Sequence, residues 1–510
     1  MLWLALHLPL LPLEAFCATL AAHEAQRPVA LISDHRVSQI NTAAAERGLR
    51  AGIKRATALA LAADLLIAES HAGREAAALQ AVAHAALAFT PAVTPQDTQT
   101  VLLEVHSSLR LFGGLAALRQ RLLAALAPLG HRVQMAAAPT ALGAALLAQW
   151  FPADRGDLVL GAHATQLPAL QRLLYEAPVH LLGPGREHGD ALQGMGLHTL
   201  SDLCPLPRAG LTRRFGAGLL DDLDRALGRQ ADPRRWLELP ATFDSRLELF
   251  ARADTTDQVL HGASVLLARL VAWAQARHAR VAAFTLRMLH EPDRHRDATA
   301  AATELRVEMA EPALDVAHLQ GLLRERLARL ALIAPTLDLQ LRCQHLVAGH
   351  APNGELFPTR ASESEGLTRL LERLRARLGD EQVLRLVPVA DHRPEHASRA
   401  VQVQGPVSTG AVTFAPVVAA ESALPLHRPV WLLPEPMPLA EREEMPLLQG
   451  RPLQLVSGPE RIETGWWDGA NVARDYFIAQ AEDGSLVWLY RARLPGRVGE
   501  PTWYLQGRFA

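Results

Sequence analysis

The sequence predicts an α+β protein with several domains, on three observations. Its 510 residues exceed the roughly 250–300 residues at which a single hydrophobic core stops growing. Short apolar runs alternate with Ala-rich helical stretches over residues 1–150, and the same mixture returns over residues 243–350. Residues 451–510 are dense in Trp, Tyr and Gly, and a Pro-rich segment precedes them. We therefore expect mixed α+β regions, a linker and a small aromatic-rich C-terminal module.

The first mixed region is expected to begin with a buried strand. The opening residues 1–20 superficially resemble a signal peptide, but they lack a basic start and contain Pro9, Pro12 and Glu14, so we interpret them as a strand plus a turn. The predicted strands are Leu2–Leu8, Val29–Ser33, Val101–Val105 and Arg132–Ala137. The predicted helices are Arg55–Leu66, Glu75–Phe89, Leu115–Ala127 and Leu142–Gln149.

The remaining elements follow the same reasoning. Residues from about 170 to 235 are predicted to be helical, with two Gly-rich turns. The second mixed region holds the predicted strands Arg246–Leu249, Val281–Leu289, Thr303–Met309 and Thr336–Leu346, and the predicted helices Thr256–His278 and Val316–Leu332. A polar stretch over 351–365 predicts a linker, and a short charged helix, Gly366–Leu378, is expected after it.

Composition excludes several classes of protein. The net charge of −2 gives no global attraction to nucleic acid, so any basic surface must be local. Cys17, Cys204 and Cys343 stand far apart and form no CxxC pair, which argues against a locally spaced zinc site and favours a reducing cytosol. No apolar run reaches the roughly 18 residues of a membrane-spanning helix, so we expect a cytoplasmic protein.

One strand carries the most specific pattern. Residues 99–106 read Gln-Thr-Val-Leu-Leu-Glu-Val-His, alternate as on a half-buried strand and contain one carboxylate, Glu104. This stretch resembles the palm strand of the Y-family (translesion) DNA polymerases, in which an adjacent Asp-Glu pair precedes a Leu-Asp step. In this chain that pair falls on Gln99 and Thr100.

The third carboxylate of the family falls on Ala5, and residues 1–33 contain no Asp that would replace it. Phosphoryl transfer by two Mg²⁺ ions needs hard anionic oxygens to hold both ions. The resemblance therefore implies a polymerase fold with no catalytic residue, no bound metal and no cofactor.

The nucleotide-binding positions are altered in the same way. By resemblance, the finger Tyr and Arg that bind the incoming triphosphate correspond to Thr42 and Ala45. The first Lys of the family's Asn-Lys-x-Leu-Ala-Lys segment corresponds to Ala141. The turn glycines Gly48 and Gly52 are retained. We therefore expect no nucleotide-binding residue, while the packing and turn positions stay polymerase-like.

A non-catalytic branch of this family fits better. The stretches Leu2–Ala15, Leu103–Gly114 and Gly458–Gly469 are similar to the ImuB proteins of bacterial damage-induced mutagenesis, which resemble Y-family polymerases but lack the acidic site. The resemblance implies a palm and fingers (1–168), a thumb (169–240), a little finger (241–350), a Pro-rich linker with a clamp-binding motif and a short helix (351–450), and a partner-binding module (451–510).

Two regions are candidates for DNA contact. Gly183, Gly185, Gly194 and Gly196 lie in turns that resemble the helix-hairpin-helix of the family, where backbone amides meet a phosphate. A helix C-cap explains such glycines equally well. In the little finger, Arg277, Arg280 and Arg287 are candidate phosphate contacts, although the acidic Glu291 and Asp293 lie nearby.

A third candidate binds protein. Asn353-Gly354-Glu355-Leu356-Phe357 resembles the bacterial sliding-clamp motif Gln-x-x-Leu-Phe, in which an extended peptide inserts a Leu-Phe pair into an apolar pocket. The departure is Asn353 in place of Gln, a shorter amide that weakens the expected contact. The alternative is that Leu356 and Phe357 pack against the little finger.

The C-terminal module has two competing interpretations. Trp466, Trp467, Asp468, Arg474 and Asp475 are either partner anchors, since Trp, Tyr and Arg are enriched there, or parts of a structural turn with buried ion pairs. The resemblance implies that this end recruits a RecA-like ImuA-type protein and an error-prone C-family polymerase.

Together these features predict a non-catalytic adaptor for SOS-induced translesion synthesis and mutagenesis. It would bind damaged primer-template DNA and the β sliding clamp, within the cytoplasm at the nucleoid. One alternative is an active polymerase with displaced ligands, for which Asp34, Asp97 and Glu104 are the nearby carboxylates. The other is a DNA-structure-binding protein with no clamp partner.

Overall fold

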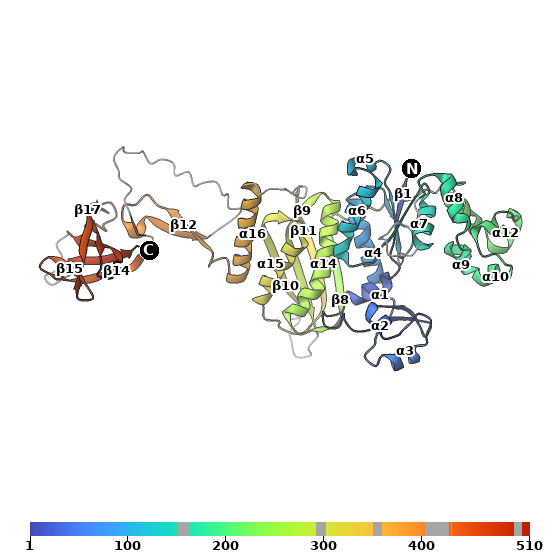
Figure 1. Cartoon of the computed structure of the whole chain (residues 1–510), viewed down its shortest axis with the longest axis horizontal. Helices are drawn as coiled ribbons and strands as arrows, with labels where there is room; N and C mark the ends of the chain where they lie inside the picture. The colour runs from blue at the N-terminus through green and yellow to red at the C-terminus, as the bar shows by residue number, and fades with distance from the viewer. Residues whose placement is uncertain are drawn as a thin grey trace. The chain divides into compact units, whose positions relative to one another are not determined.

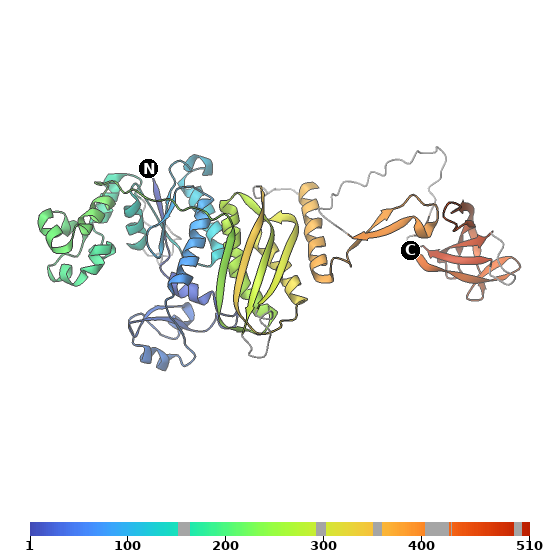
Figure 2. The same ribbon diagram turned by 180° about the vertical axis from the view of Figure 1, so that it is seen from behind.

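The computed structural model describes residues 1–150, 164–291, 302–349, 360–402, 428–429, 431–493 and 502–509, with only the backbone of 360–365. The chain forms two compact units, Met1–Arg377 and Leu378–Ala510. Figures 1 and 2 show the elements of both units from opposite sides. Helices and strands mix in the first unit, and the described residues of the second unit are rich in strands, which confirms the predicted α+β multidomain class with a C-terminal module.

The first unit begins with a four-stranded antiparallel sheet, here called the palm sheet. Its order is β5 (Val93–Pro95), β6 (Thr100–Glu104), β1 (Trp3–His7) and β7 (Gln134–Ala138). Helices α4 (Ala72–Leu87) and α6 (Leu115–Leu126) pack with Leu4 and Leu6 of β1 on one face. Helix α7 (Ala141–Trp150) packs with Ala5 on the other face. Because side chains alternate along a strand, β1 supplies both cores, as its uniformly apolar sequence requires.

A small three-stranded sheet projects from the palm sheet in the region expected to be the fingers (Figure 1). Its strands are β2 (Val29–Ser33), β3 (Arg36–Ile40) and β4 (Leu66–Ala68), and its helices are α1 (Leu11–Cys17), α2 (Thr42–Glu46) and α3 (Arg55–Leu61). The predicted helix Arg55–Leu66 was too long: Ala62 is extended, and Leu66 starts a strand that pairs in parallel with β2. Tertiary pairing overrides the helical propensity of these residues.

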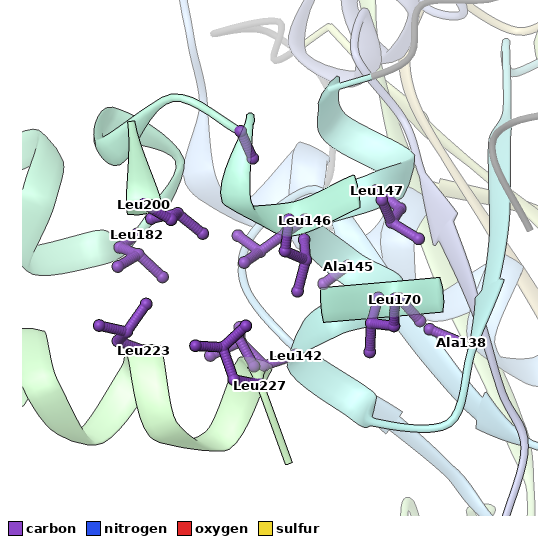
Figure 3. Packing of buried hydrophobic residues seen from close by; sticks show 14 of the residues in the cluster. Ala138, Leu142, Ala145, Leu146, Leu147, Leu170, Leu182, Leu200, Leu223 and Leu227 are labelled. Carbon is purple, nitrogen blue, oxygen red and sulfur yellow. The ribbon is translucent and has the colours of Figure 1, made fainter. Parts of the chain in front are cut away.

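Short helices follow the palm sheet in the region expected to be the thumb. They are α8 (Leu167–Tyr175), α9 (Gly183–Glu187), α10 (Gly189–Gly194), α11 (Leu200–Leu203), α12 (Arg208–Phe215) and α13 (Gly218–Ala226), with the 3₁₀ turn η2 (Val179–Leu181). Their leucines share one core with α7, and Figure 3 shows Leu142 and Leu146 of α7 beside Leu170, Leu223 and Leu227. The predicted helical character of this region is therefore confirmed.

The next domain is a sheet with two helices on one face. The little-finger sheet has the order β10 (Ala302–Ala313), β9 (Ala279–His290), β11 (Thr336–Ala348) and β8 (Phe243–Ala253). Helices α14 (Thr256–Ala276) and α15 (Val316–Ala328) bury their apolar faces against it. A Thr255–Gln258 capping box starts α14 where the sequence predicted. Within the described residues, α14 is the helix long and apolar enough to span a membrane, but it is the mostly buried core helix of this domain.

Helix α16 (Arg360–Leu378) completes the little-finger domain. It starts six residues before the predicted helix Gly366–Leu378, and Ala376 belongs to the same core as α14 and α15. Glu372 accepts hydrogen bonds from the amides of Ala310 (2.5 Å) and Glu311 (3.2 Å) and lies 2.9 Å from His318 Nε2. The helix is thus fixed to the domain that precedes it.

The second unit contains a hairpin and a seven-stranded antiparallel sheet. The hairpin pairs β12 (Leu384–Pro388) with β13 (Ser398–Gln402). The sheet has the order β16 (Arg451–Pro452), β15 (Met445–Leu448), β14 (Trp431–Arg442), β20 (Trp503–Arg508), β19 (Leu486–Ala492), β18 (Val472–Gln480) and β17 (Gln454–Thr464). Strands β14 and β15 therefore lie inside residues 351–450, where a linker was expected, and they belong to the same sheet as the aromatic-rich residues.

Candidate functional site

The palm sheet fixes the positions that correspond to the catalytic carboxylates. Ala5 of β1 is the partner of Leu102 in β6 and of Ala136 in β7, and His7 is the partner of Thr100. Paired residues of antiparallel strands share a face, so Ala5, His7 and Thr100 lie on the side that α7 covers. Ala5 and Thr100 are fully buried. The register therefore brings two of the three degenerate positions to one face of the sheet, and Gln99 immediately precedes Thr100.

A neutral polar network occupies this end of the sheet. His7 Nδ1 lies 3.0 Å from Thr100 Oγ1, and the Gln149 side-chain amide donates to Asp97 Oδ2 (3.2 Å) and Thr100 Oγ1 (3.5 Å). Burial holds the pKa of His7 below its ordinary value, although the Asp97 carboxylate opposes this shift. The shift favours the uncharged imidazole, and Asp97 is the one carboxylate among these hydrogen-bonded groups.

The three carboxylates of the alternative reading do not meet. Asp97 lies in the β5–β6 turn and accepts from the Gln99 amide (2.8 Å), whereas Glu104 ends β6 and accepts from the Leu2 amide (3.2 Å). Asp34 sits in the turn between β2 and β3 with φ 50°. Among the described residues no group of three His, Cys, Asp or Glu side chains is arranged to hold a metal ion. This donor set does not fit the two Mg²⁺ ions of a polymerase.

Helix α7 fills the space beside the degenerate site. Ala141 is buried, and Thr140 Oγ1 donates to the Ala226 carbonyl (2.8 Å) while accepting from the Gly143 amide (3.2 Å). A Cβ at Gly143 would lie 2.8 Å from Leu170 Cδ2, which shows how closely α7 meets the α8 and α13 helices (Figure 3). The position of the expected Lys is therefore a packing position in this chain.

The finger positions are exposed instead. Thr42 and Ala45 lie on the solvent side of α2, a one-turn helix capped by Asn41. Gly48 and Gly52 both adopt positive φ (83° and 90°), which explains why these turn positions hold glycine. Neither exposed side chain carries a charge that would contact a triphosphate.

The thumb glycines separate into two structural roles. Gly185 of α9 is a close-approach position, because a Cβ there would meet the Val179 carbonyl oxygen at 2.1 Å. Gly196 follows α10 with φ 76°, the geometry of a helix C-terminal turn, while Gly183 and Gly194 begin α9 and end α10. The structure thus supplies a packing or turn reason for Gly185 and Gly196 that is independent of DNA.

The little-finger arginines are each engaged. Arg277 donates to the Pro240 carbonyl (2.9 Å) and lies over the Trp273 ring, and Arg287 Nε lies 3.7 Å from Glu304. Arg280 packs near Gly349 and has a further partner of its own. None of the three is presented as a bare cation.

The rest of the open sheet face is also balanced in charge. On the side away from α14, Arg246 pairs with Asp338 (2.7 Å) and Arg342 pairs with Asp244 (3.2 Å). Burial raises the pKa of Asp338 despite the Arg246 bond. The sequence alone did not identify these acidic partners, because the pairing of β8 with β11 is what brings them next to the arginines.

The clamp-binding candidate Asn353, Leu356 and Phe357 lies outside the described residues. The elements on either side are described: β11 ends at Ala348 and α16 begins at Arg360, and both belong to the little-finger domain. The motif therefore connects two elements of one domain and does not open a long linker.

The C-terminal candidates divide into exposed and engaged residues. Trp466 and Trp467 are 72% and 56% exposed, with ring centroids 4.8 Å apart. Asp468 accepts from Arg393 (2.7 Å), which also holds Asp391. These bonds keep the pKa of the Asp468 carboxyl below its ordinary range and that of Asp391 at about 2. Arg393 thus anchors the turn that carries Trp466, Trp467 and Asp468, here called the tryptophan loop.

A second network supports the neighbouring strands. Arg474 bonds Glu395 (2.9 Å) and the Tyr476 hydroxyl (3.0 Å), and Tyr476 donates to Gln506 (2.6 Å). Asp475 accepts from Arg461 (2.9 Å). The sequence analysis missed Arg393 and Glu395, because they lie in the stretch expected to be a linker. Their position in a charged turn between prolines could have indicated ordered structure there.

Comparison with known proteins agrees with this picture. Residues 13–149 match the IMS (impB/mucB/samB) family. Two curated proteins named Protein ImuB, from two strains of Caulobacter vibrioides, are 29% identical over 484 residues, which is 91% of this chain and all of theirs.

Solved structures are similar over about two thirds of the chain. The insertion ternary complex of Dbh DNA polymerase is 15% identical with a TM-score of 0.38, covering 68% of this chain and 100% of that one. DinB from Sulfolobus solfataricus is 16% identical with a TM-score of 0.35, covering 69% of this chain and 100% of that one.

The near full-length match and the family match both fall on the elements described above. The sequence resemblance is thereby confirmed: the chain is similar to the ImuB proteins over most of its length, and residues 13–149 match the impB/mucB/samB family.

Proposed function

We propose that this chain is a non-catalytic adaptor that binds primer-template DNA and the sliding clamp and recruits a separate polymerase to damaged sites. The observation that carries the proposal is the palm register. The register pairs His7 with Thr100 beside Ala5, and the His7–Thr100–Gln149 network lies at the positions that the sequence resemblance aligns with the metal ligands, which supports the proposal. A fold kept without its metal ligands fits a role in assembly.

Two surfaces support the recruiting role. Asn353-Gly354-Glu355-Leu356-Phe357 resembles a clamp-binding peptide, and such short motifs bind at roughly micromolar Kd. The exposed Trp466–Trp467 pair has the residue type and exposure of an interface anchor. We assign the first surface to the β sliding clamp and the second to the error-prone C-family polymerase or an ImuA-type partner, in the cytoplasm at the nucleoid during the SOS response.

Pulldown with purified clamp tests the first surface. Leu356→Ala with Phe357→Ala should abolish capture of the clamp. Leu370→Ala with Leu374→Ala, which alters exposed leucines of the neighbouring α16, should leave it unchanged. Full clamp capture by the Leu356/Phe357 variant would favour a DNA-structure-binding protein without a clamp partner.

Pulldown with the candidate polymerase and the ImuA-type protein tests the second surface. Trp466→Ala with Trp467→Ala should weaken binding of one of them by about 2 kcal/mol or more, because buried Trp anchors dominate interface energies. The control is Trp431→Ala, a 69% exposed tryptophan of the same unit. Equal losses in both variants would contradict the assignment.

A further inference from the structure

A cavity of about 840 Å³ lies between the palm and little-finger elements of the first unit. Its walls come from α4 and α1 on one side and from β8 and α14 on the other, elements that lie close together in both views (Figures 1 and 2). Phe16 of α1 meets Phe250 of β8 at one end, with ring centroids 5.3 Å apart. Since α4 covers the palm-sheet face opposite Ala5, the cavity is separate from the degenerate site.

Two buried basic side chains of this cavity have no carboxylate partner among the described residues. The Arg269 side chain on α14 is buried (5% exposed), and its one hydrogen bond within the described part of the chain is to Ser245 Oγ at 3.4 Å. His84 on α4 is also buried (6% exposed), and its Nε2 has no partner among the described residues. Arg74, near the start of α4, also lines the cavity, and its Nε has no hydrogen-bond partner among the described residues. Burial lowers the pKa of Arg269 to about 10 and that of His84 to about 4.

Two acidic residues of the cavity lining are paired with arginines, although Asp338 Oδ1 has no hydrogen-bond partner among the described residues. Asp338 holds Arg246 (2.7 Å), and Asp244 accepts from Arg342 (3.2 Å) and from the Gln340 amide (2.7 Å). The Glu248 carboxylate acts to raise the pKa of Arg74, against the effect of burial, whereas burial alone shifts the pKa of Arg269. A buried guanidinium without a carboxylate is costly to keep, and an unpaired buried donor calls for a ligand or ion.

We propose that Arg269 and His84, with Arg74, form a binding site for phosphate groups in this cavity. A guanidinium presents a planar fork of donors that suits phosphate oxygens, and an imidazole N–H adds a second direction. The volume lies within the range of about 300–1,000 Å³ typical of small-ligand pockets. Because the donors come from α4 and α14, a bound phosphate ligand joins the palm to the little finger.

Isothermal titration calorimetry with the full chain tests the site, in phosphate-free buffer at constant ionic strength. The probes are inorganic pyrophosphate, dATP and an oligo-dT strand, which distinguish a free polyphosphate, a nucleotide and a nucleic-acid backbone as the source of the phosphate. We expect saturable binding of at least one probe. Arg269→Met and His84→Gln should each weaken that binding at least tenfold.

The control is Arg324→Met on α15 of the same domain, since Arg324 is exposed and does not line the cavity. It should bind the probe as the unaltered chain does. Arg269→Met removes an unpaired buried charge, so its thermal midpoint without ligand should match or exceed that of the unaltered chain, which shows that it folds. Absence of saturable binding by all three probes, or binding that neither Arg269→Met nor His84→Gln weakens, would overturn the proposal.

Discussion

At the residue scale, the positions that the sequence resemblance aligns with catalytic carboxylates are packing and hydrogen-bonding positions in the palm sheet. Ala5 is fully buried among Leu102, Ala136 and the residues of α7, so its small side chain is now a packing requirement. His7 Nδ1 and Thr100 Oγ1 lie 3.0 Å apart on the same face of the sheet.

This packing predicts an asymmetric response to restored carboxylates. Ala5→Asp should lower the free energy of unfolding by about 3 kcal/mol, because it buries an unpaired carboxylate. Ala45→Asp, at the exposed degenerate position on α2, should change it by less than about 0.5 kcal/mol. Urea denaturation of both variants measures the difference. Equal stabilities would mean that the face beside Ala5 is open to water.

His84 predicts a pH dependence of stability. Burial lowers its pKa in the folded chain to about 4 from an ordinary value of 6.5, so between these values the unfolded chain binds the extra proton. Stability is therefore lost as pH falls below 6.5. From pH 7 to pH 5 this residue should cost about 2 kcal/mol, and His84→Gln should remove that part of the loss. Denaturant midpoints at both pH values, without phosphate, measure it; parallel profiles for the two chains would contradict the assignment.

At the element scale, regular hydrophobic periodicity was enough to predict most strands and helices. β2 occupies the predicted residues, and α14 begins at the predicted Thr256, because alternation and a capping box are local signals. The short strands β3, β4 and β5 were missed, since they depend on pairing with distant residues.

The C-terminal sheet shows the same limit. Pro434 and Pro436 obscured β14 in the sequence, yet they fall where its register with β20 is interrupted, between Leu432 and Met437. Proline is tolerated there because no regular ladder bond is lost. Ala5 and Thr100 fall on stretches that the sequence predicted to be strands, and the strand register brings them to one face of the sheet. The charge partners of Arg287, Asp468 and Arg474 were not, because they lie on other elements.

Helix α16 offers a test of element anchoring. Glu372→Ala should lower the stability of the little-finger domain by about 3 kcal/mol, since it removes a buried acceptor of two amides and the partner of His318. Arg373→Ala, an exposed change on the same helix, should have little effect. Hydrogen exchange of the α16 amides should rise in the first variant alone. Unchanged protection would show that Ala376 and its apolar neighbours suffice to hold the helix.

At the scale of the whole molecule, charge is balanced locally as well as overall. The net charge is −2, and the open face of the little-finger sheet pairs Arg246, Arg287 and Arg342 with acidic residues. Under the proposed function, we therefore expect the chain to reach DNA mainly through protein partners. The clamp motif, between β11 and α16, and the tryptophan loop belong to different compact units, so the two attachments are separable.

This balance predicts a weak salt dependence of DNA binding. The slope of log K against log salt should have a magnitude of about 2, because each phosphate contact contributes about 0.9 and few arginines are unpaired. Asp244→Asn with Glu304→Gln should steepen it by freeing Arg342 and Arg287. Fluorescence anisotropy with primer-template DNA measures both slopes. A slope beyond about 5 for the unaltered chain would indicate a basic surface that these ion pairs do not explain.

The most direct test of the central claim is primer extension by the highly purified chain, with Mg²⁺ or Mn²⁺ and all four nucleotides. The account predicts no extension even at high protein excess, because Ala5, Gln99 and Thr100 supply no carboxylate for the two metal ions. Reproducible extension that Asp97→Asn or Glu104→Gln abolishes would contradict it and identify a polymerase with relocated metal ligands.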